Sequence, residues 1–375
     1  MGHRERNNSA TQFYLNTGYV IVEKKTSIMN ITRKLLTAIV AVISIFIILS
    51  CNPREDSYES PSTSTLFTAL DTVSIKDFRG DPLYDSYNTR VTSEEIIIPE
   101  TQKNKILVYG RYGSPIKEIG RTGKGPLEFN LPYDAVRSRS GYLYVLDRKN
   151  KRIQILTDDG RQKDVINGIT QAHEIELTGG EEPTLLVLAP TGCGEKSCLV
   201  TEYDEFGSAK DRYAILNKDQ IHLHSWVMAQ YGNKVYVSNI LNYILRVYEN
   251  GKHVKDIELD SPSLIDIELE QDPGSREALQ AQLDKLRSEV HTRIRSIDVY
   301  DGHIFVCNEI RNTEHDRFFV DIYTTSGELV YHGVEVPGIM LNIDNGEIYF
   351  RSQTFLEDYM NLKIYSFGIN NASFK

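Results

Sequence analysis

Paired histidines are the first residues in this sequence whose types and spacing could support chemistry. His222 and His224 alternate along a predicted strand, so both imidazoles would face one side and could hold a metal ion. Neither a third histidine nor a carboxylate follows at the spacing of a metal motif, so hydrogen-bonded or solvated histidines are the other interpretation. The sequence contains no G-x-S-x-G turn and no H-E-x-x-H motif. We therefore predict no catalytic residues.

A second set of candidates joins aromatic rings to carboxylates. The dipeptide Tyr84-Asp85 recurs as Tyr133-Asp134, and a histidine precedes a carboxylate at His173-Glu174. Aromatic faces beside carboxylates and an arginine suit a sugar or a peptide. The candidate ligand-binding set is Tyr84, Asp85, Tyr133, Asp134, His173, Glu174, His224, Trp226 and Arg295. For each of them, packing between strands or a turn at a strand end is the alternative.

The elements that would position these residues belong to an internal repeat. Residues 94–113 align without a gap with residues 141–160, an offset of 47 residues. Each copy has an apolar strand, a polar turn, an alternating strand and a glycine turn, which predicts a hairpin followed by a third strand. The first strand of the unit recurs around Ile97, Tyr144, Leu186, Tyr236, Phe305 and Tyr349.

The spacing of these copies predicts the fold class. Successive copies are 47, 42, 50, 69 and 44 residues apart, which is typical of propeller blades with several strands each. We predict an all-β, six-bladed β-propeller over residues 66–375. Each innermost strand should precede its repeat unit, which places the candidate residues at the mouth of a central channel. The alternating segment 70–75 lies before the first blade, so we expect it to complete the last one and close the ring.

One helix interrupts the repeats, before the main hairpin of the fifth blade. Asp272-Pro273 offers an N-cap and a proline at the first helical position. Leu279, Leu283, Leu286, Val290 and Ile294 then follow at helical spacing, which predicts a helix over 273–294 with one apolar stripe. Packing on the propeller rim and binding of a partner are the two roles that this stripe allows.

Two motifs carry family resemblances. Gly123-Lys124-Gly125-Pro126-Leu127-Glu128-Phe129, followed by the segments 143–147 and 152–155, resembles an NHL-type propeller repeat. More broadly, residues 66–370 resemble the six-bladed, NHL- or TolB-like propeller lipoproteins that are abundant in Bacteroidota. This resemblance implies a fold and an envelope location, and it implies no single activity. The glycines at 120–125 do not form a phosphate loop, because the motif lacks G-x4-G-K-[ST] and leads into a strand.

The first 50 residues are expected to lie outside the fold. Arg33 and Lys34 precede the apolar run 35–49, which ends at Leu49-Ser50-Cys51. This order is typical of a secretion signal, and the last residues resemble the lipobox of bacterial lipoproteins. The resemblance implies cleavage before Cys51, lipidation of its thiol and a flexible tether over 52–65, with Met29 as the true start. A transmembrane anchor is the alternative, although the run is short for a span.

The remaining cysteines and the charge limit the partners. In an exported protein, Cys193 and Cys198 could form a disulfide at a hairpin tip, and Cys307 lies in an apolar strand pattern. The net charge of −10 and the lack of a basic stripe argue against nucleic acid. We expect a monomer attached to the membrane by its lipid, most simply at the outer membrane.

Two functional hypotheses follow. The first is a binding or scaffold protein for a glycan, a peptide or a protein. The second is a propeller hydrolase or lyase that uses a divalent ion at the central channel. No resident cofactor is predicted, although calcium would suit Asp85, Asp134 and Glu174 under the second hypothesis.

Overall fold

The structure, a computed structural model, describes residues 66–81, 83, 88–178, 183–193, 196–204, 207–216, 226–269, 274–313, 317–352 and 362–370. The predicted signal segment, Cys51 and the tether lie outside these residues, as do Tyr84, Asp85, His222, His224, Asp272 and Pro273. The predictions that concern these residues are therefore untested, apart from the predicted start of the helix, which the described residues from 274 onward do test.

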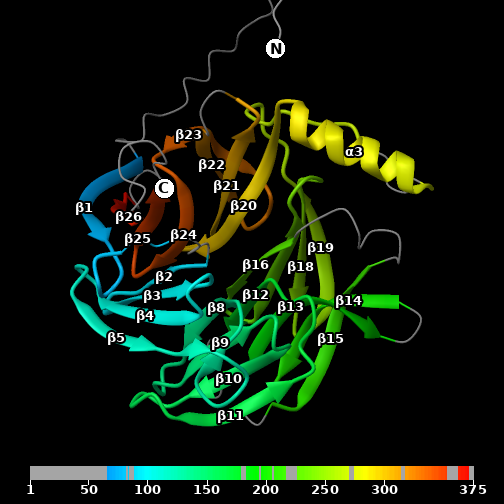
Figure 1. The fold of residues 1–375 in the computed structure, drawn as a ribbon. Helices are drawn as coiled ribbons and strands as arrows, with labels where there is room; N and C mark the ends of the chain where they lie inside the picture. The colour runs from blue at the N-terminus through cyan, green and yellow to red at the C-terminus, as the bar shows by residue number, and fades with distance from the viewer. Residues whose placement is uncertain are drawn as a thin grey trace, which may run out of the picture. The chain divides into compact units, whose positions relative to one another are not determined.

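Six four-stranded antiparallel sheets form the predicted propeller (Figure 1). Blade 1 contains β2 (Arg90–Val91), β3 (Glu95–Glu100), β4 (Lys105–Gly110) and β5 (Pro115–Ile119). Blade 2 contains β8 (Pro132–Arg137), β9 (Leu143–Asp147), β10 (Arg152–Leu156) and β11 (Gln162–Asn167). Blade 3 contains β12 (Glu174–Leu177), β13 (Leu185–Cys193), β14 (Lys196–Tyr203) and β15 (Ala209–Leu216).

The later blades follow the same order, from the innermost strand to the rim. Blade 4 contains β16 (Trp226–Tyr231), β17 (Lys234–Asn239), β18 (Ile244–Glu249) and β19 (Lys252–Glu258). Blade 5 contains β20 (His291–Tyr300), β21 (His303–Arg311), β22 (Arg317–Thr324) and β23 (Leu329–Val336). Blade 6 contains β24 (Ile339–Asp344), β25 (Glu347–Ser352), β26 (Leu362–Ile369) and β1 (Phe67–Ile75). A short parallel pair, β6 (Arg121–Thr122) and β7 (Glu128–Phe129), precedes blade 2.

The predicted ring closure is confirmed. Strand β1 pairs antiparallel with β26 from Phe67↔Ile369 to Ile75↔Leu362, so the start of the described chain supplies the outer strand of blade 6 (Figure 1). This pairing covers an edge that would otherwise expose unpaired backbone groups.

Apolar side chains between neighbouring blades form the core. Six buried clusters occur, one at each junction between blades. Strand β13 illustrates the pattern: Leu185 and Val187 pack toward blade 2, whereas Leu186 and Leu188 pack toward blade 4. Because both faces of a blade are covered, its second strand reads as a continuous apolar run, as in β3, β9, β13 and β17, whereas the outer strands are largely exposed.

The helix precedes blade 5 as predicted, but it is shorter. Helix α3 runs Arg276–Ser288, and the side chain of its N-cap, Ser275, accepts a hydrogen bond from the backbone N–H of Ala278. The predicted start at 273 and end at 294 were therefore wrong. Ile294 lies instead in β20, buried in the core between blades 4 and 5, because pairing with β21 overrides the helical spacing. Leu279, Leu283 and Leu286 remain half-buried on the helix.

The described cysteines form one disulfide pair and one buried free thiol. Cys193 and Cys198 are joined in a disulfide between β13 and β14, and the Cys307 thiol is free and buried in the core. Burial raises the pKa of Cys307 to about 12, which fits an inert core residue. None of the helices in the described part of the chain has the length and apolar character that a membrane crossing requires.

Candidate functional site at the central channel

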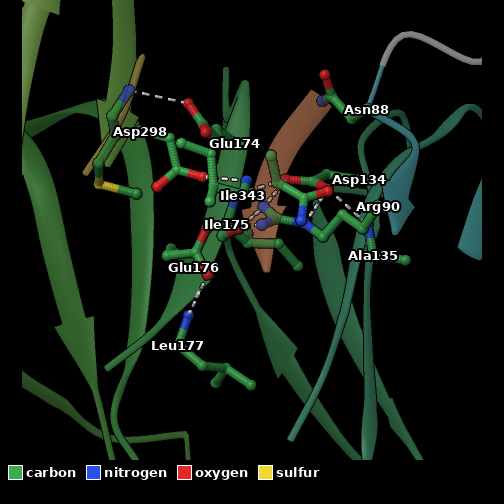
Figure 2. Close-up of polar contacts among 12 residues, drawn as sticks. Asn88, Arg90, Asp134, Ala135, Glu174, Ile175, Glu176, Leu177, Asp298 and Ile343 are labelled. Carbon is green, nitrogen blue, oxygen red and sulfur yellow. Dashed lines mark hydrogen bonds and ion pairs between the residues drawn. The ribbon is translucent and has the colours of Figure 1, made fainter. Parts of the chain in front are cut away.

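Arg90, on the innermost strand of blade 1, lies at the centre of a charged network (Figure 2). Its guanidinium forms a two-pronged ion pair with Asp134 at 3.2 and 3.3 Å and reaches Glu176 at 2.6 Å. It also donates a hydrogen bond to the backbone carbonyl of Ile175. These contacts join the innermost strands of blades 1, 2 and 3, which are far apart in the sequence.

Carboxylates of this network also accept hydrogen bonds from backbone N–H groups of the next blade. Asp134 accepts from Ile175 at 2.8 Å, and Glu174 accepts from Met228 at 3.0 Å. Asp298 on β20 accepts from Ile343 on β24 at 2.6 Å (Figure 2). An inner strand has one edge without a strand partner, so these carboxylates satisfy backbone donors that would otherwise depend on channel water.

The network has more negative than positive charge among its described members. Arg90 is the cation, while Asp134, Glu174, Glu176 and Asp298 are carboxyl groups. Burial raises the pKa of Glu174 to about 8; Arg90 opposes the shift, and the charges of Asp134 and Glu176 add to it. Burial likewise raises the pKa of Asp298 to about 7.

The ion pair between Arg90 and Asp134 shifts the pKa of both groups. Burial alone would lower the pKa of Arg90, but Asp134 and Glu176 raise it well above its ordinary value. Burial also raises the pKa of Asp134, against the opposing effect of Arg90. Perturbed groups gathered in one place are typical of functional sites, and structural ion pairs can produce them too.

Two of the predicted residues occupy equivalent β-bulges. The register between β8 and β9 shifts between Pro132 and Asp134, which makes Tyr133 an extra residue. The register between β20 and β21 shifts between Ile294 and Ser296, which does the same for Arg295. Bulges redirect side chains and are frequent beside functional sites. Blades 2 and 5 are opposite each other in a ring of six, so the two bulges face the channel from opposite sides.

Tyr133 of blade 2 and His173, which precedes the innermost strand of blade 3, both interact with Arg148. The Arg148 guanidinium lies 4.5 Å from the centre of the Tyr133 ring. Burial lowers the pKa of His173, and the charge of Arg148 adds to that effect. Asn88 of blade 1 donates a hydrogen bond to the His173 carbonyl at 3.1 Å. Both candidate side chains remain half-buried and open in part to solvent.

The other candidates have different environments. Asp134 is completely buried, so it stabilises the ring and offers no accessible surface to a ligand. Trp226 is 9% exposed and packs in the core between blades 3 and 4, with Arg246 6.0 Å from its ring centre. This burial favours the structural alternative for Trp226. Arg295 is half-buried and lies with Glu309 rather than with Tyr133 or His173.

The prediction from sequence missed Arg90, Glu176 and Asp298. Each is a charged residue inside a predicted strand, a signal that could have singled them out. Their partners come from other blades, so no local spacing reveals the network. Among the residues that the structure describes, no group of three or more His, Cys, Asp or Glu side chains is arranged to hold a metal ion.

The fold and the network of Arg90 together define a six-bladed β-propeller with charged side chains on its innermost strands. No protein-family model matches the sequence. A member of the DUF4221 family from Bacteroides vulgatus has a similar structure, with a TM-score of 0.59, 13% identity, and coverage of 81% of this chain and 98% of that chain. A Bacteroides fragilis protein provisionally described as exported has a TM-score of 0.57 at 11% identity, covering 83% and 97% respectively. At these identities the similarity establishes the fold alone.

Proposed function

We propose that this protein is a lipid-anchored binding or scaffold protein of the bacterial cell envelope, with its ligand site at the channel mouth. The observation that supports this most is the pair of bulges at Tyr133 and Arg295, which lie on the innermost strands of two opposite blades. The innermost strand of blade 6 also has a bulge, at Leu341, which packs against the core, whereas the bulges of blades 2 and 5 carry a tyrosine and an arginine.

The proposed location has separate support. The segment before Cys51 resembles a lipobox, and the outer membrane is the simplest destination of such a protein. One protein of similar fold is provisionally described as exported, which agrees with this proposal. The acidic chain, with a net charge of −10, would gain little from anionic headgroups, so attachment would depend on the acyl chains.

The ligand class follows from the side chains at the mouth. Tyr133 presents an aromatic face, which suits sugar rings and peptide side chains. Hydrogen-bonding groups beside it, including His173, would fix the orientation of such a ligand. A glycan or a peptide is therefore the proposed ligand.

Glycan and peptide array screening of the full chain, purified in detergent, tests this proposal. The Tyr133→Ala variant should weaken binding by about tenfold or more, as expected for the loss of an aromatic contact. Tyr112→Ala is the matched control, since Tyr112 is 75% exposed and lies outside the channel strands. If the two variants bind equally to a ligand found in the screen, the proposed site is wrong.

The second function is a hydrolase or lyase that uses a divalent ion such as calcium. Its support is that Glu174 and Asp298 place carboxyl groups on the innermost strands of blades 3 and 5. Metal analysis of the protein purified without chelators separates the two proposals. A stoichiometric divalent ion that is lost in a Glu174→Gln, Asp298→Asn double variant would favour the enzyme.

A further inference from the structure

Three arginines surround one glutamate where the inner strand of blade 5 begins. Arg293 Nε lies 2.7 Å from Glu309 Oε2, and Arg311 Nη1 lies 2.9 Å from Glu309 Oε1. Arg295 Nε lies 3.6 Å from Oε2, beyond hydrogen-bond distance. We call Arg293, Arg295, Glu309 and Arg311 the arginine cluster. Within the described residues it has three positive charges and one negative charge.

Within the arginine cluster, the Nε group of Arg295 lacks a hydrogen-bond partner among the described residues. Arg295 is the extra residue of the bulge between β20 and β21, so its side chain is directed differently from those of its neighbours. Its Nε is buried and has no hydrogen-bond acceptor among the described residues. A buried guanidinium N–H without an acceptor is costly, and an incoming oxyanion would remove that cost.

The arginines are accessible, whereas the glutamate is not. The side chains of Arg293 and Arg295 are 26% and 21% exposed and that of Arg311 is 36% exposed, against 4% for Glu309. Solvent therefore reaches the cationic side of the cluster and hardly touches its anion. A planar guanidinium presents paired N–H donors that match the oxygens of a carboxylate, a sulfate or a phosphate.

The electrostatics agree with an excess of positive charge. Burial lowers the pKa of Arg293, and the charges of Arg295 and Arg311 lower it further, against the effect of Glu309. Burial would raise the pKa of Glu309, but Arg293 and Arg295 hold it below its ordinary value. Glu309 thus serves both Arg293 and Arg295, and a second anion beside Arg295 would supply the acceptor that its Nε lacks among the described residues.

We propose that the arginine cluster binds an oxyanion group, so that the ligand of this propeller carries a carboxylate, sulfate or phosphate. The proposal rests on the proposed function, which places ligand binding at the channel mouth, and it adds the chemical class. An acidic sugar or an acidic peptide would meet both Tyr133 and the arginine cluster only if it reaches across the channel.

Isothermal titration of the full chain in detergent with glucuronate, sulfate and inorganic phosphate tests the proposal. We expect saturable binding of at least one of them, and the preferred ion identifies the oxyanion. Arg295→Gln should weaken that binding by about tenfold, the loss expected for one charge-assisted contact. Arg295→Lys keeps the charge but loses the paired donors, so it should also bind more weakly.

Arg317→Gln is the matched control, because Arg317 lies in the same blade and pairs with Glu335 on the surface. It should bind like the unaltered protein. Equal binding by Arg295→Gln and Arg317→Gln overturns the proposal, as does the absence of binding by the unaltered protein.

Glu314 and Asp316 follow Arg311 in the sequence, outside the described residues. Binding that appears only in a Glu314→Gln, Asp316→Asn variant would show an internally neutralised cluster and would also overturn it.

The two proposals can fail separately. A neutral ligand whose binding depends on Tyr133 but not on Arg295 would support the channel-mouth site and contradict the oxyanion site. Oxyanion binding that depends on Arg295 but not on Tyr133, with no glycan or peptide found on the arrays, would do the reverse.

Discussion

The side chain of Asn342 on β24 forms hydrogen bonds with both the backbone N–H and the backbone carbonyl of Val91 on β2. The side-chain carbonyl accepts the Val91 N–H at 2.9 Å, and the side-chain amide donates to the Val91 carbonyl at 2.7 Å. Asn342 belongs to blade 6 and Val91 to blade 1, so these two hydrogen bonds close the ring at its axis. Strand β1 closes the same ring at its rim by pairing with β26.

Replacing Asn342 should weaken this closure. In Asn342→Ala, both groups of Val91 lose their partner, and we expect about 1–3 kcal/mol of stability to be lost. Chemical denaturation measures the change. Asn233→Ala is the control, because Asn233 is exposed in a turn and should cost much less. An unchanged midpoint for Asn342→Ala would mean that water replaces the side chain at no cost.

Arg152 binds the backbone of the glycine-rich segment 123–129 and fixes it to blade 2. It pairs with the buried Asp147 at 2.9 Å and donates to the carbonyls of Lys124, Gly125 and Glu128 at 2.7 to 2.9 Å. The motif therefore encodes a loop fixed to blade 2 rather than a ligand site. Arg152→Lys should cost about 2–4 kcal/mol, since an ammonium group cannot serve all four acceptors.

Thermal denaturation of Arg152→Lys beside Arg161→Lys tests this role. Arg161 is 80% exposed and pairs with the exposed Asp159, so its substitution should change the melting temperature very little. Equal melting temperatures for the two variants would show that the loop does not depend on the guanidinium of Arg152.

Trp226 should behave as a core residue. Because its indole is buried between blades 3 and 4, Trp226→Ala should cost about 3–5 kcal/mol of stability. Tyr231→Ala on the same strand is the control, as Tyr231 is 43% exposed. A melting temperature that stays unchanged in Trp226→Ala, with weaker ligand binding, would restore the binding role considered for this residue.

The sequence predicts most of the fold because every blade buries both of its faces. That burial leaves apolar runs around Ile97, Tyr144 and the later repeat centres. Their spacing counts the blades, with one longer gap that holds the helix. Closure by 70–75 could be predicted because the last blade otherwise lacks a strand. The end of the helix could not, because Val290 and Ile294 fit helical spacing and only pairing with β21 moves Ile294 into a strand.

The site could be predicted only in part. The rule that an innermost strand precedes each repeat located Tyr133, His173 and Arg295. Burial depends on neighbours from other blades, so the sequence could not separate the buried Trp226 from the more accessible Tyr133. The network of Arg90 and the arginine cluster of Glu309 depend on tertiary pairing in the same way.

Anchoring should depend on Cys51, the residue that would carry the lipid. We expect Cys51→Ala to lose acylation and to appear in the soluble fraction, since a thioether-linked lipid has no other attachment point in the lipobox interpretation. Detergent partitioning and mass measurement of the N-terminal peptide test this. Ser50→Ala is the control, as a small residue before the cysteine should remain processed. A Cys51→Ala protein that stays membrane-bound and uncleaved would favour a transmembrane helix.

The carboxyl group of Glu174 should make stability depend on pH. Its pKa is about 8 in the folded protein, against an ordinary value of 4.5, so the folded state binds the proton more tightly. The resulting stabilisation is complete below about pH 4.5 and is lost as the pH rises through about 8. Because the side chain is only half-buried, we expect the loss to be about 1–3 kcal/mol.

Denaturation midpoints between pH 5 and 9 measure this loss of stability. Glu174→Gln keeps an acceptor for the Met228 N–H and should flatten this profile, whereas the exposed Glu335→Gln should leave it unchanged. Parallel profiles for the unaltered protein and Glu174→Gln would show that Glu174 does not hold its proton in the folded state.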